Sequence, residues 1–351
     1  MVTMPVPDRE RYPLRTIPGY DALRPGIQIG TQFSSSACDD DLILAQQLGV
    51  EWAMVSVDDP SLHSVEGYLK LKERFAAFGL QIYRIANHRC HNMSEVTLGL
   101  PERDARIAEY LQYIRNLGAA GIHYATYAHM ANGIWSSGSE RTRGGAESRA
   151  FRLESSPVGR WIDTTFAGEL THGRAYTEAE LWDNYAYFIR KVVPVAEESG
   201  VYIGIHPDDP PAPALGGIPR PLFSSFEGYR RALEMASSPN IGVCLCVGCW
   251  LEGGAAMGKD VVEAIHYFGS RRQLFKVHLR NVSAPLPEGF VETYLDDGYM
   301  DMLDVVSALQ AVRFDGAIIS DHLPSMVGGR RVAEAYHIGY MRALVHATGA
   351  D

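Results

Sequence analysis

The sequence predicts an α/β fold, a single-domain (β/α)8 barrel (TIM barrel) with a long insertion after the fourth strand. Eight short apolar runs alternate with longer amphipathic runs along the 351 residues. Strands that are apolar on both faces are typical of parallel sheets covered by helices, and eight βα units favour a barrel. A doubly wound open sheet is the alternative, but no glycine-rich dinucleotide turn follows the first predicted strand.

The predicted strands are short runs rich in apolar and β-branched residues. The first contains "IQIGT", and the fifth, "VYIGIHP", breaks into a polar turn rich in proline. In chain order the strands cover residues 27–31, 51–57, 80–86, 122–129, 201–207, 241–248, 273–281 and 316–322.

The predicted helices carry apolar residues at the i, i+3 and i+4 spacing of an amphipathic helix. Several of these runs end in glycine just before the next strand, which is a common helix stop. In chain order the helical runs cover residues 40–49, 64–79, 101–121, 177–200, 225–237, 260–270, 301–314 and 330–349.

Two segments stand apart from this alternation. Residues 1–26 are polar and rich in proline, and we expect them to form an N-terminal arm over the barrel or a partner subunit. The barrel domain then occupies residues 27–351. The stretch from about 130 to 173 is too long for a simple connection, so we expect it to form a lid or a subunit contact.

The composition excludes several classes of protein. With 46% hydrophobic and 21% charged residues it is typical of a globular protein, and the net charge of −10 argues against a nucleic-acid partner. No apolar run is long enough to span a bilayer, and the first residues lack a signal-peptide core. Five cysteines, an odd number, favour a reducing compartment over a disulfide framework. We therefore expect a cytoplasmic protein with no membrane partner.

Residues of metal-binding types stand at the ends of the last four predicted strands. Barrel enzymes build their sites at the carboxyl ends of strands. Two imidazoles, a thiolate and a carboxylate could hold a divalent ion such as Mn²⁺, Fe²⁺, Co²⁺, Ni²⁺ or Zn²⁺. Each residue alone is more often structural, but four on four strands favour a metal site. They are His206, Cys246, His278 and Asp321.

Strand alternation selects among the clustered cysteines. Cys244 and Cys246 project to the same side, and Cys246 lies nearer the carboxyl end of the strand. Cys246 is therefore the expected ligand and Cys244 a core residue. Cys249, in the following loop, is the fallback.

Two further residues near these strand ends suggest chemistry. His322 follows Asp321 directly, and a histidine beside a metal is a candidate general acid or base near neutral pH. The alternative is a supporting or surface histidine. Alternation also places Lys276 and Arg280 on the side of His278, so Arg280 could hold a substrate carboxylate.

Five motifs link the sequence to a known family: "LGLPERDARIAEYLQYIRNLGAAGI", "HPDDPPAPALGGIPR", "GVCLCVG", "KVHLRN" and "SDH". With them the chain resembles the mannonate dehydratase family, whose metal-dependent barrels are related in architecture to xylose-isomerase-like enzymes. The resemblance runs over most of the chain from residue 98. It implies that the four residues at the strand ends bind Mn²⁺ or a similar ion. It also implies that His322 and a tyrosine of the last helix, best matched by Tyr336, exchange protons with the substrate.

The resemblance further implies a set of substrate-side residues. The aspartates after His206 would orient ligands or accept sugar hydroxyls, in a turn fixed by prolines. The segment "YAHMANGIW" matches the substrate loop of the family. The expected substrate-side residues are Asp208, Asp209, Tyr127, Trp135, Arg280, Asn281, His88 and Arg89.

Two departures from the family pattern affect this side. The segment "ANHR" keeps His88 but places Arg89 where the family has Glu, and the usual Arg before the Asp-His pair is absent. A carboxylate needs a positive partner. We therefore expect Arg89 to supply it, and an aldonic acid other than D-mannonate to be favoured.

The implied function is that of a metal-dependent sugar-acid dehydratase, a hydro-lyase that converts an aldonic acid to a 2-keto-3-deoxy acid. The alternatives are a metal-dependent sugar isomerase or epimerase, a β-eliminating lyase on an oxidised sugar, and a non-catalytic sugar-binding barrel. The expected partners are a small sugar acid or sugar, and copies of the same chain in a dimer or tetramer.

Overall fold

The computed structural model describes residues 16–20 and 25–349, so most of the arm expected over residues 1–26 lies outside the described residues. Within this arm, Ile17 and Tyr20 are buried in the interior cluster at the amino-terminal end of the barrel. The Tyr20 ring packs against Trp52 and Tyr83. This short segment therefore helps to close that end of the barrel.

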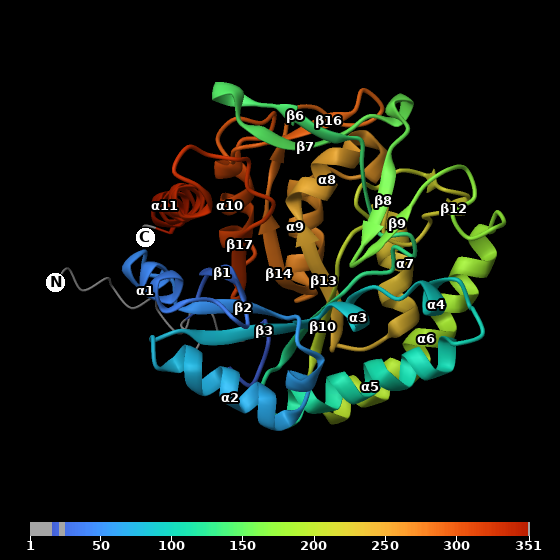
Figure 1. Cartoon of the computed structure of the whole chain (residues 1–351), viewed down its shortest axis with the longest axis horizontal. Helices are drawn as coiled ribbons and strands as arrows, with labels where there is room; N and C mark the ends of the chain where they lie inside the picture. The colour runs from blue at the N-terminus through green and yellow to red at the C-terminus, as the bar shows by residue number, and fades with distance from the viewer. Residues whose placement is uncertain (1–15, 21–24, 350–351) are drawn as a thin grey trace.

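Eight parallel strands form a nearly closed barrel, which confirms the fold predicted from the sequence (Figure 1). They are β1 (Gln28–Ser34), β2 (Trp52–Val57), β3 (Gln81–Asn87), β4 (Tyr124–Tyr127), β10 (Tyr202–Ile205), β13 (Ile241–Cys246), β14 (Leu274–Leu279) and β17 (Ala317–Ser320). The order is β3-β2-β1-β17-β14-β13-β10-β4. A bridge between Asn92 and Ala128, after β3 and β4, brings the two ends of the sheet together. Each predicted strand overlaps one of these eight.

The predicted helices surround the barrel. They are α1 (Asp39–Gln47), α2 (Val65–Ala76), α5 (Arg103–Ala119), α6 (Glu178–Glu198), α7 (Phe226–Ala236), α9 (Val261–Ser270), α10 (Met302–Ala311) and α11 (Arg330–Thr348). Short helices lie in the loops: α3 (His88–His91), α4 (Ser94–Thr97), α8 (Val247–Gly253), η1 (Pro60–Leu62), η2 (Arg143–Gly145), η3 (Leu153–Ser155) and η4 (Gly254–Met257). None of the described helices combines the length and the apolar character needed to cross a bilayer.

Local sequence signals explain where the main helices begin. Ser64, Thr177, Ser225 and Asp260 each accept a backbone N–H of the first helical turn, which offsets the unpaired donors there. The apolar face of α6 is buried against the barrel, as its spacing predicts.

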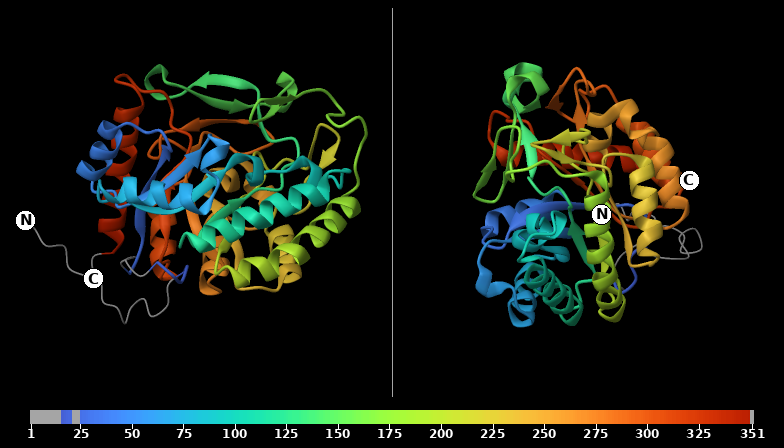
Figure 2. Two further views of the ribbon diagram at one scale, coloured as in Figure 1. Left: turned by 60° about the horizontal axis from the view of Figure 1, so that its bottom comes forward. Right: turned by 90° about the vertical axis from the view of Figure 1, so that its right-hand side faces the viewer.

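The insertion after β4 forms small antiparallel sheets at the carboxyl end of the barrel (Figures 1 and 2). Its strands are β5 (Ile134–Ser136), β6 (Gly138–Arg141), β7 (Glu147–Phe151), β8 (Val158–Trp161) and β9 (Thr164–Phe166). The β6–β7 hairpin continues into β16 (Phe290–Thr293) and β15 (Asn281–Val282), whereas β5, β8 and β9 form a separate sheet. A final hairpin joins β11 (Ala214–Leu215) and β12 (Ile218–Pro219). The insertion therefore lies over the end of the barrel where the predicted site is located.

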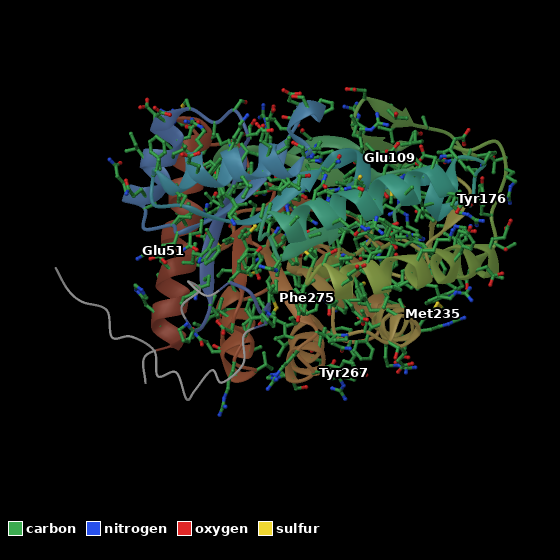
Figure 3. All side chains as sticks on the ribbon, turned by 90° about the horizontal axis from the view of Figure 1, so that it is seen from below. Glu51, Glu109, Tyr176, Met235, Tyr267 and Phe275 are labelled. Atoms are coloured by element: carbon green, nitrogen blue, oxygen red, sulfur yellow. The ribbon has the colours of Figure 1, made fainter. Side chains whose placement is uncertain are left out.

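Two apolar clusters fill the protein. The larger lies between the barrel and the helices, and the smaller lies inside the barrel, where it includes Trp52, Tyr83, Tyr124 and Phe275. In the view from below, Phe275 lies inward of the labelled residues of α5, α7 and α9 (Figure 3). This inner cluster fills the amino-terminal half and leaves the carboxyl end to polar residues.

Candidate metal centre

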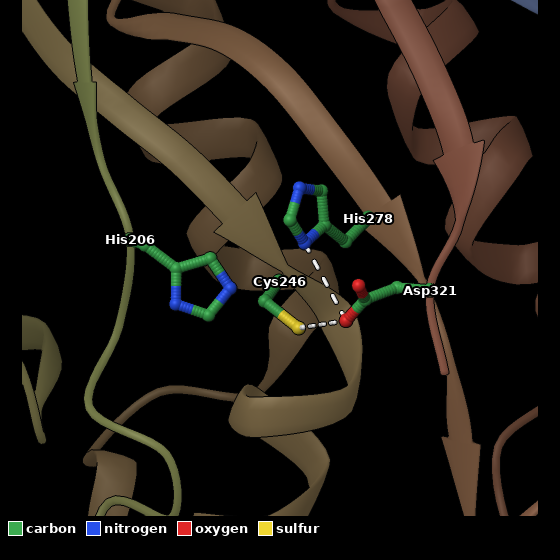
Figure 4. A group of neighbouring side chains, drawn as sticks. All are labelled: His206, Cys246, His278 and Asp321. Carbon is green, nitrogen blue, oxygen red and sulfur yellow. Dashed lines mark hydrogen bonds and ion pairs between the residues drawn. The ribbon is translucent and has the colours of Figure 1, made fainter. Parts of the chain in front are cut away.

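The four residues of metal-binding types come together at the carboxyl end of the barrel. Their ligand atoms all lie within 4.8 Å of one another. Asp321 Oδ2 lies 3.8 Å from Cys246 Sγ and 3.5 Å from His278 Nδ1 (Figure 4). Cys246 and His278 are also paired in register on neighbouring strands. With His206 after β10, these residues form a group that could hold a divalent ion.

The free nitrogens of the two histidines fit such an ion. His206 Nδ1 lies 2.8 Å from the carbonyl oxygen of Pro207 and donates its proton there, which leaves Nε2 for a ligand role. His278 Nε2 lies 3.5 Å from Cys244 Sγ. Among the described residues, the buried Nδ1 of His278 has no hydrogen-bond partner. An orphaned buried nitrogen costs free energy, which a bound ion would offset.

The environment of Cys246 suits a thiolate. Cys246 precedes α8, and its Sγ accepts the backbone N–H of Cys249 at 3.5 Å. Burial alone would raise the pKa of Cys246, but a hydrogen bond from the Cys249 side chain, nearby Arg280 and the two histidines hold the pKa well below its ordinary value. The thiolate is the form that binds metal ions. Cys249 Sγ instead lies 3.0 Å from Arg280 Nη2.

A second buried group lies beside these donors, and we call it the charge network. It contains three carboxylates, two guanidiniums and one imidazole: Asp209, Glu252, Glu292, Arg149, Arg280 and His322. Arg149, on β7 of the insertion, reaches all three carboxylates at 2.6–2.8 Å. Buried ion pairs thus hold the insertion to the floor of the barrel mouth.

Arg280, which the sequence predicted to hold a substrate carboxylate, lies at the centre of this network. Its guanidinium lies 2.8 Å from Glu292, 3.0 Å from Glu252 and 3.2 Å from Asp209, and its side chain is 0% exposed. Protein carboxylates therefore occupy the N–H groups that a substrate would need. Asp209 is likewise committed: burial opposes its ionisation, but Arg149 and Arg280 lower its pKa.

His322 connects the charge network to open space. Its Nδ1 lies 2.7 Å from Glu292 Oε1, and its φ of 48° marks a left-handed backbone where the chain turns after β17. Burial favours the neutral ring, but the Glu292 and Asp321 carboxylates raise the pKa of His322 to about 9. The imidazole is therefore charged at neutral pH.

Two cavities meet at His322. The mouth cavity, of about 690 Å³, is lined by residues of β1, the end of β2 and the start of α11, together with His88. The side cavity, of about 430 Å³, lies between β7 and the chain after His322. A third cavity, of about 790 Å³, lies among α8, α9 and α10 and is lined by none of the expected site residues. The mouth and side cavities are thus the spaces that His322 can serve.

The structure does not bring Tyr336 to this place. Its hydroxyl accepts a hydrogen bond from Arg143 Nη2 at 3.2 Å, and its ring packs against Tyr294 and His337. The residues of α11 that line the mouth cavity are Arg330, Ala333 and Glu334. The rotation of the helix therefore turns Tyr336 toward the outer edge of the insertion, which a sequence match cannot reveal.

Four other expected substrate residues make hydrogen bonds or packing contacts with neighbouring parts of the chain. Asp208 accepts the Ser224 hydroxyl at 2.8 Å. The amide of Asn281 donates to the carbonyls of Leu295 and Met300. Trp135 donates its indole N–H to Asn132. Tyr127 packs on Phe188 of α6, on the helix side of the barrel wall. None of the four side chains lines the mouth cavity.

His88 and Arg89 lie in different surroundings. The chain changes from strand to helix between β3 and α3, so consecutive side chains diverge. His88 lines the mouth cavity, and burial followed by the charge of Arg84 lowers its pKa. Arg89 is exposed and lines neither the mouth nor the side cavity. The arginine that β3 directs inward is Arg84, which the sequence analysis did not single out.

Sequence reasoning missed several charged residues here. Arg149, Glu252 and Glu292 lie on β7, α8 and β16, outside the predicted strands and helices, where no spacing signal marks them. Arg84 could have been found, because it is a charged residue inside an otherwise apolar strand run, and Lys276 was placed on the side of His278 but given no role.

Comparisons with known proteins agree with this architecture. The family model described as D-mannonate dehydratase (UxuA) matches residues 40–349. A mannonate dehydratase 2 of Halalkalibacterium halodurans is 30% identical over 315 residues, covering 84% of this chain and 88% of the relative. A mannonate dehydratase of Thermotoga neapolitana is 30% identical over 326 residues, covering 84% of this chain and 87% of the relative.

Solved structures give the same result. The crystal structure of mannonate dehydratase from Streptococcus suis serotype 2 superposes with a TM-score of 0.79 at 27% identity, covering 92% of this chain and 95% of that one. An L-ribulose 3-epimerase structure, at 15% identity and a TM-score of 0.59, covers 92% of this chain and 96% of that one and shares the fold alone. This chain belongs to the D-mannonate dehydratase family of hydro-lyases.

Proposed function

We propose that this protein uses a divalent metal ion, Mn²⁺ in preference, to remove water from an aldonic acid and give a 2-keto-3-deoxy acid. The observation that carries the proposal is the convergence of His206, Cys246, His278 and Asp321 within 4.8 Å at the mouth of the barrel. Membership of the family supports the reaction. The donor set also suits Fe²⁺, Co²⁺, Ni²⁺ or Zn²⁺.

The reaction removes the C2 proton and expels the C3 hydroxyl as water, and the enol product then becomes the 2-keto acid. When bound, the ion would act as a Lewis acid toward substrate oxygens. His322 is suited to protonate the departing hydroxyl from Nε2, because its Nδ1 faces Glu292 and its ring is charged at neutral pH.

We propose His88 as the base that takes the C2 proton. His88 lines the same cavity as His322, and its lowered pKa keeps its ring neutral at neutral pH. Two histidines whose surroundings push their pKa values apart can serve as acid and base at one pH. Tyr336, the expected partner of His322, accepts a hydrogen bond from Arg143 and is not among the residues that line the mouth cavity, so we assign the base to His88 instead.

Product analysis tests the reaction. The metal-loaded protein is incubated with a panel of aldonic acids that includes D-mannonate, and the products are examined by mass spectrometry. Loss of one water supports a dehydratase, whereas products of unchanged mass indicate an isomerase or epimerase. Release of an alcohol from a glycoside of an oxidised sugar indicates a β-eliminating lyase.

Matched variants test the residues. His322→Asn and His88→Asn should keep metal and lower kcat by roughly 10²–10⁴-fold, whereas Tyr336→Phe should stay near wild type. Cys246→Ser should lose metal, with Cys249→Ser as the control that keeps it. A metal-loaded His322→Asn variant with normal kcat would remove His322 from the mechanism. The dimer or tetramer and the cytoplasmic location stay predictions.

A further inference from the structure

Two cations lie inside the barrel beneath the candidate metal centre. Arg84 on β3 is 5% exposed and Lys276 on β14 is 0% exposed. Lys276 Nζ and Arg84 Nε are buried and have no hydrogen-bond partner among the described residues. In the part of the chain that the structure describes, neither residue forms an ion pair within 4.0 Å. We call these two residues the cation pair.

Strand irregularities explain why both side chains point inward. The register of β3 shifts at Arg84, and the register of β14 shifts at Lys276. On β3, Ile82 and Ile85 belong to the helix-side core, and the residues between them face the interior. On β14, Leu274 and Val277 bracket Phe275 and Lys276 in the same way. The two cations therefore approach each other from opposite sides of the barrel, since β3 and β14 are four places apart in the eight-stranded order.

The electrostatics of this position are unfavourable without an anion. Burial, followed by the positive charge of Arg84, disfavours the charged form of Lys276. The anionic groups that favour its charged form are Cys244, Asp321 and Cys246, and the last two belong to the candidate metal centre. A divalent ion bound there would neutralise those two charges. Two buried cations would then lack compensation, and burying unpaired charge is costly.

The strand register places the cation pair relative to the mouth cavity. Ser56, which lines the mouth cavity, pairs with Ala86, two residues beyond Arg84 on β3. His278 stands two residues beyond Lys276 on β14. The cation pair thus lies one layer below the cavity floor, beside the donors of the metal centre. A guanidinium binds a carboxylate with two parallel hydrogen bonds.

We propose that Arg84 and Lys276 form the subsite for the substrate carboxylate. The carboxylate enters between the two cations, with Arg84 as its direct partner, and the hydroxylated chain lies in the mouth cavity toward His322. Arg280 is closed off by protein carboxylates and Arg89 is exposed, so neither competes for this role. The assignment rests on the proposed function for the identity of the substrate, but the anion site itself does not.

Binding of a minimal probe tests the subsite without turnover. Glycolate carries one carboxylate and one adjacent hydroxyl, and ethylene glycol is its uncharged control. Glycolate should bind the metal-loaded protein in calorimetry and raise its unfolding temperature, and ethylene glycol should do neither. Arg84→Met and Lys276→Met should each weaken glycolate binding by roughly 10- to 100-fold, the loss expected for charge-assisted hydrogen bonds. Arg89→Met is the matched control and should bind glycolate as the wild type does.

Further variants and assays distinguish a failure of the carboxylate subsite from a failure of the proposed function. Arg84→Lys keeps the charge but loses the two-pronged geometry, so its Kd should lie between those of the wild type and Arg84→Met, and it serves if Arg84→Met fails to fold. Equal glycolate affinity in the wild type and Arg84→Met would overturn the subsite. If aldonic acids lose water with an unchanged KM in Arg84→Met, the subsite fails and the function stands. If glycolate binding depends on Arg84 but no aldonic acid is dehydrated, the subsite stands and the proposed function fails.

Discussion

The mouth of the barrel contains two sets of buried charges that differ in their partners. In the charge network, Arg149 and Arg280 face three carboxylates at 2.6–3.2 Å. In the cation pair, Arg84 and Lys276 have no carboxylate within ion-pair distance among the described residues, and their buried Nε and Nζ are unpaired. The two sets lie on neighbouring layers of one barrel, so burial alone does not explain the difference.

The difference separates charges that hold the fold together from charges that can bind a ligand. A buried ion pair holds together the segments that carry it, and removal of one partner leaves the other charge buried and unpaired. An unpaired buried cation lowers the stability of the ligand-free protein, and a bound anion offsets this cost. The charge network accordingly joins the insertion to the barrel, and the cation pair is the set that a substrate would complete.

The largest change in stability is expected when the charge network is broken at its centre, Arg280. Arg280→Met leaves three buried carboxylates with Arg149 and His322 alone, and should lower the free energy of unfolding by about 3–5 kcal/mol. Urea denaturation measures this change, with exposed Arg115→Met as a control that stays within about 0.5 kcal/mol of wild type. A loss below about 1 kcal/mol for Arg280→Met would mean that the network does not hold the mouth together.

A smaller effect is expected at the edge of the same network. Arg149 is 14% exposed and holds only the insertion, so Arg149→Met should cost about 2 kcal/mol, less than the fully buried case. Freed from the barrel, the β6–β7 hairpin should be cut faster by trypsin at Arg141 and Arg143. Arg160→Met, in β8 of the insertion, is the control. Unchanged cleavage in Arg149→Met would show that other contacts anchor the hairpin.

For the cation pair, we expect a substitution to raise the stability of the protein rather than to lower it. Lys276→Met removes a buried charge whose neighbouring anions are neutralised once the ion is bound, and it keeps a side chain of similar length, so it should raise the stability of the ligand-free, metal-loaded protein by about 1 kcal/mol. Urea denaturation beside Arg280→Met gives the direct contrast. Destabilisation of similar size in both variants would erase the distinction between the two sets.

The last effect concerns the pH dependence of stability. Because the pKa of His322 is raised from 6.5 to about 9, the folded state keeps a proton that the unfolded state releases first. The stability contributed by this proton is complete below pH 6.5 and is lost as the pH rises through 9. In metal-free protein, stability should therefore fall more steeply across this window in the wild type than in His322→Gln. Parallel curves would show that the folded protein does not raise the pKa of His322.

The two sets of charges also show which features of the site could be predicted from the sequence. Strand and helix periodicity predicted the eight βα units, and because the carboxyl ends of parallel strands meet, it predicted that His206, Cys246, His278 and Asp321 would converge. Periodicity gives the direction of a side chain but not its partners. Arg280 was placed on the correct side of its strand, yet the carboxylates that enclose it come from a distant loop, a short helix and β16.

Local irregularity limited the remaining expectations. The resemblance to the family selected Arg89 and Tyr336, and a sequence match gives a position in the chain but not the surroundings of a side chain. The register shift in β3 turns Arg84 inward, whereas Arg89 follows on the short helix α3 and is exposed. The rotation of α11 places the Tyr336 hydroxyl against Arg143. These placements depend on packing that the sequence pattern does not encode.

The most direct test is a crystal structure of the His322→Asn variant with Mn²⁺ and the aldonic acid that product analysis identifies, because the variant should bind this substrate without consuming it. We expect the ion among His206, Cys246, His278 and Asp321, the carboxylate against Arg84 and Lys276, and the charge network unchanged around Arg280. A carboxylate bound to Arg280 or Arg89, with Arg84 still unpaired, would contradict the distinction between the two sets of buried charges.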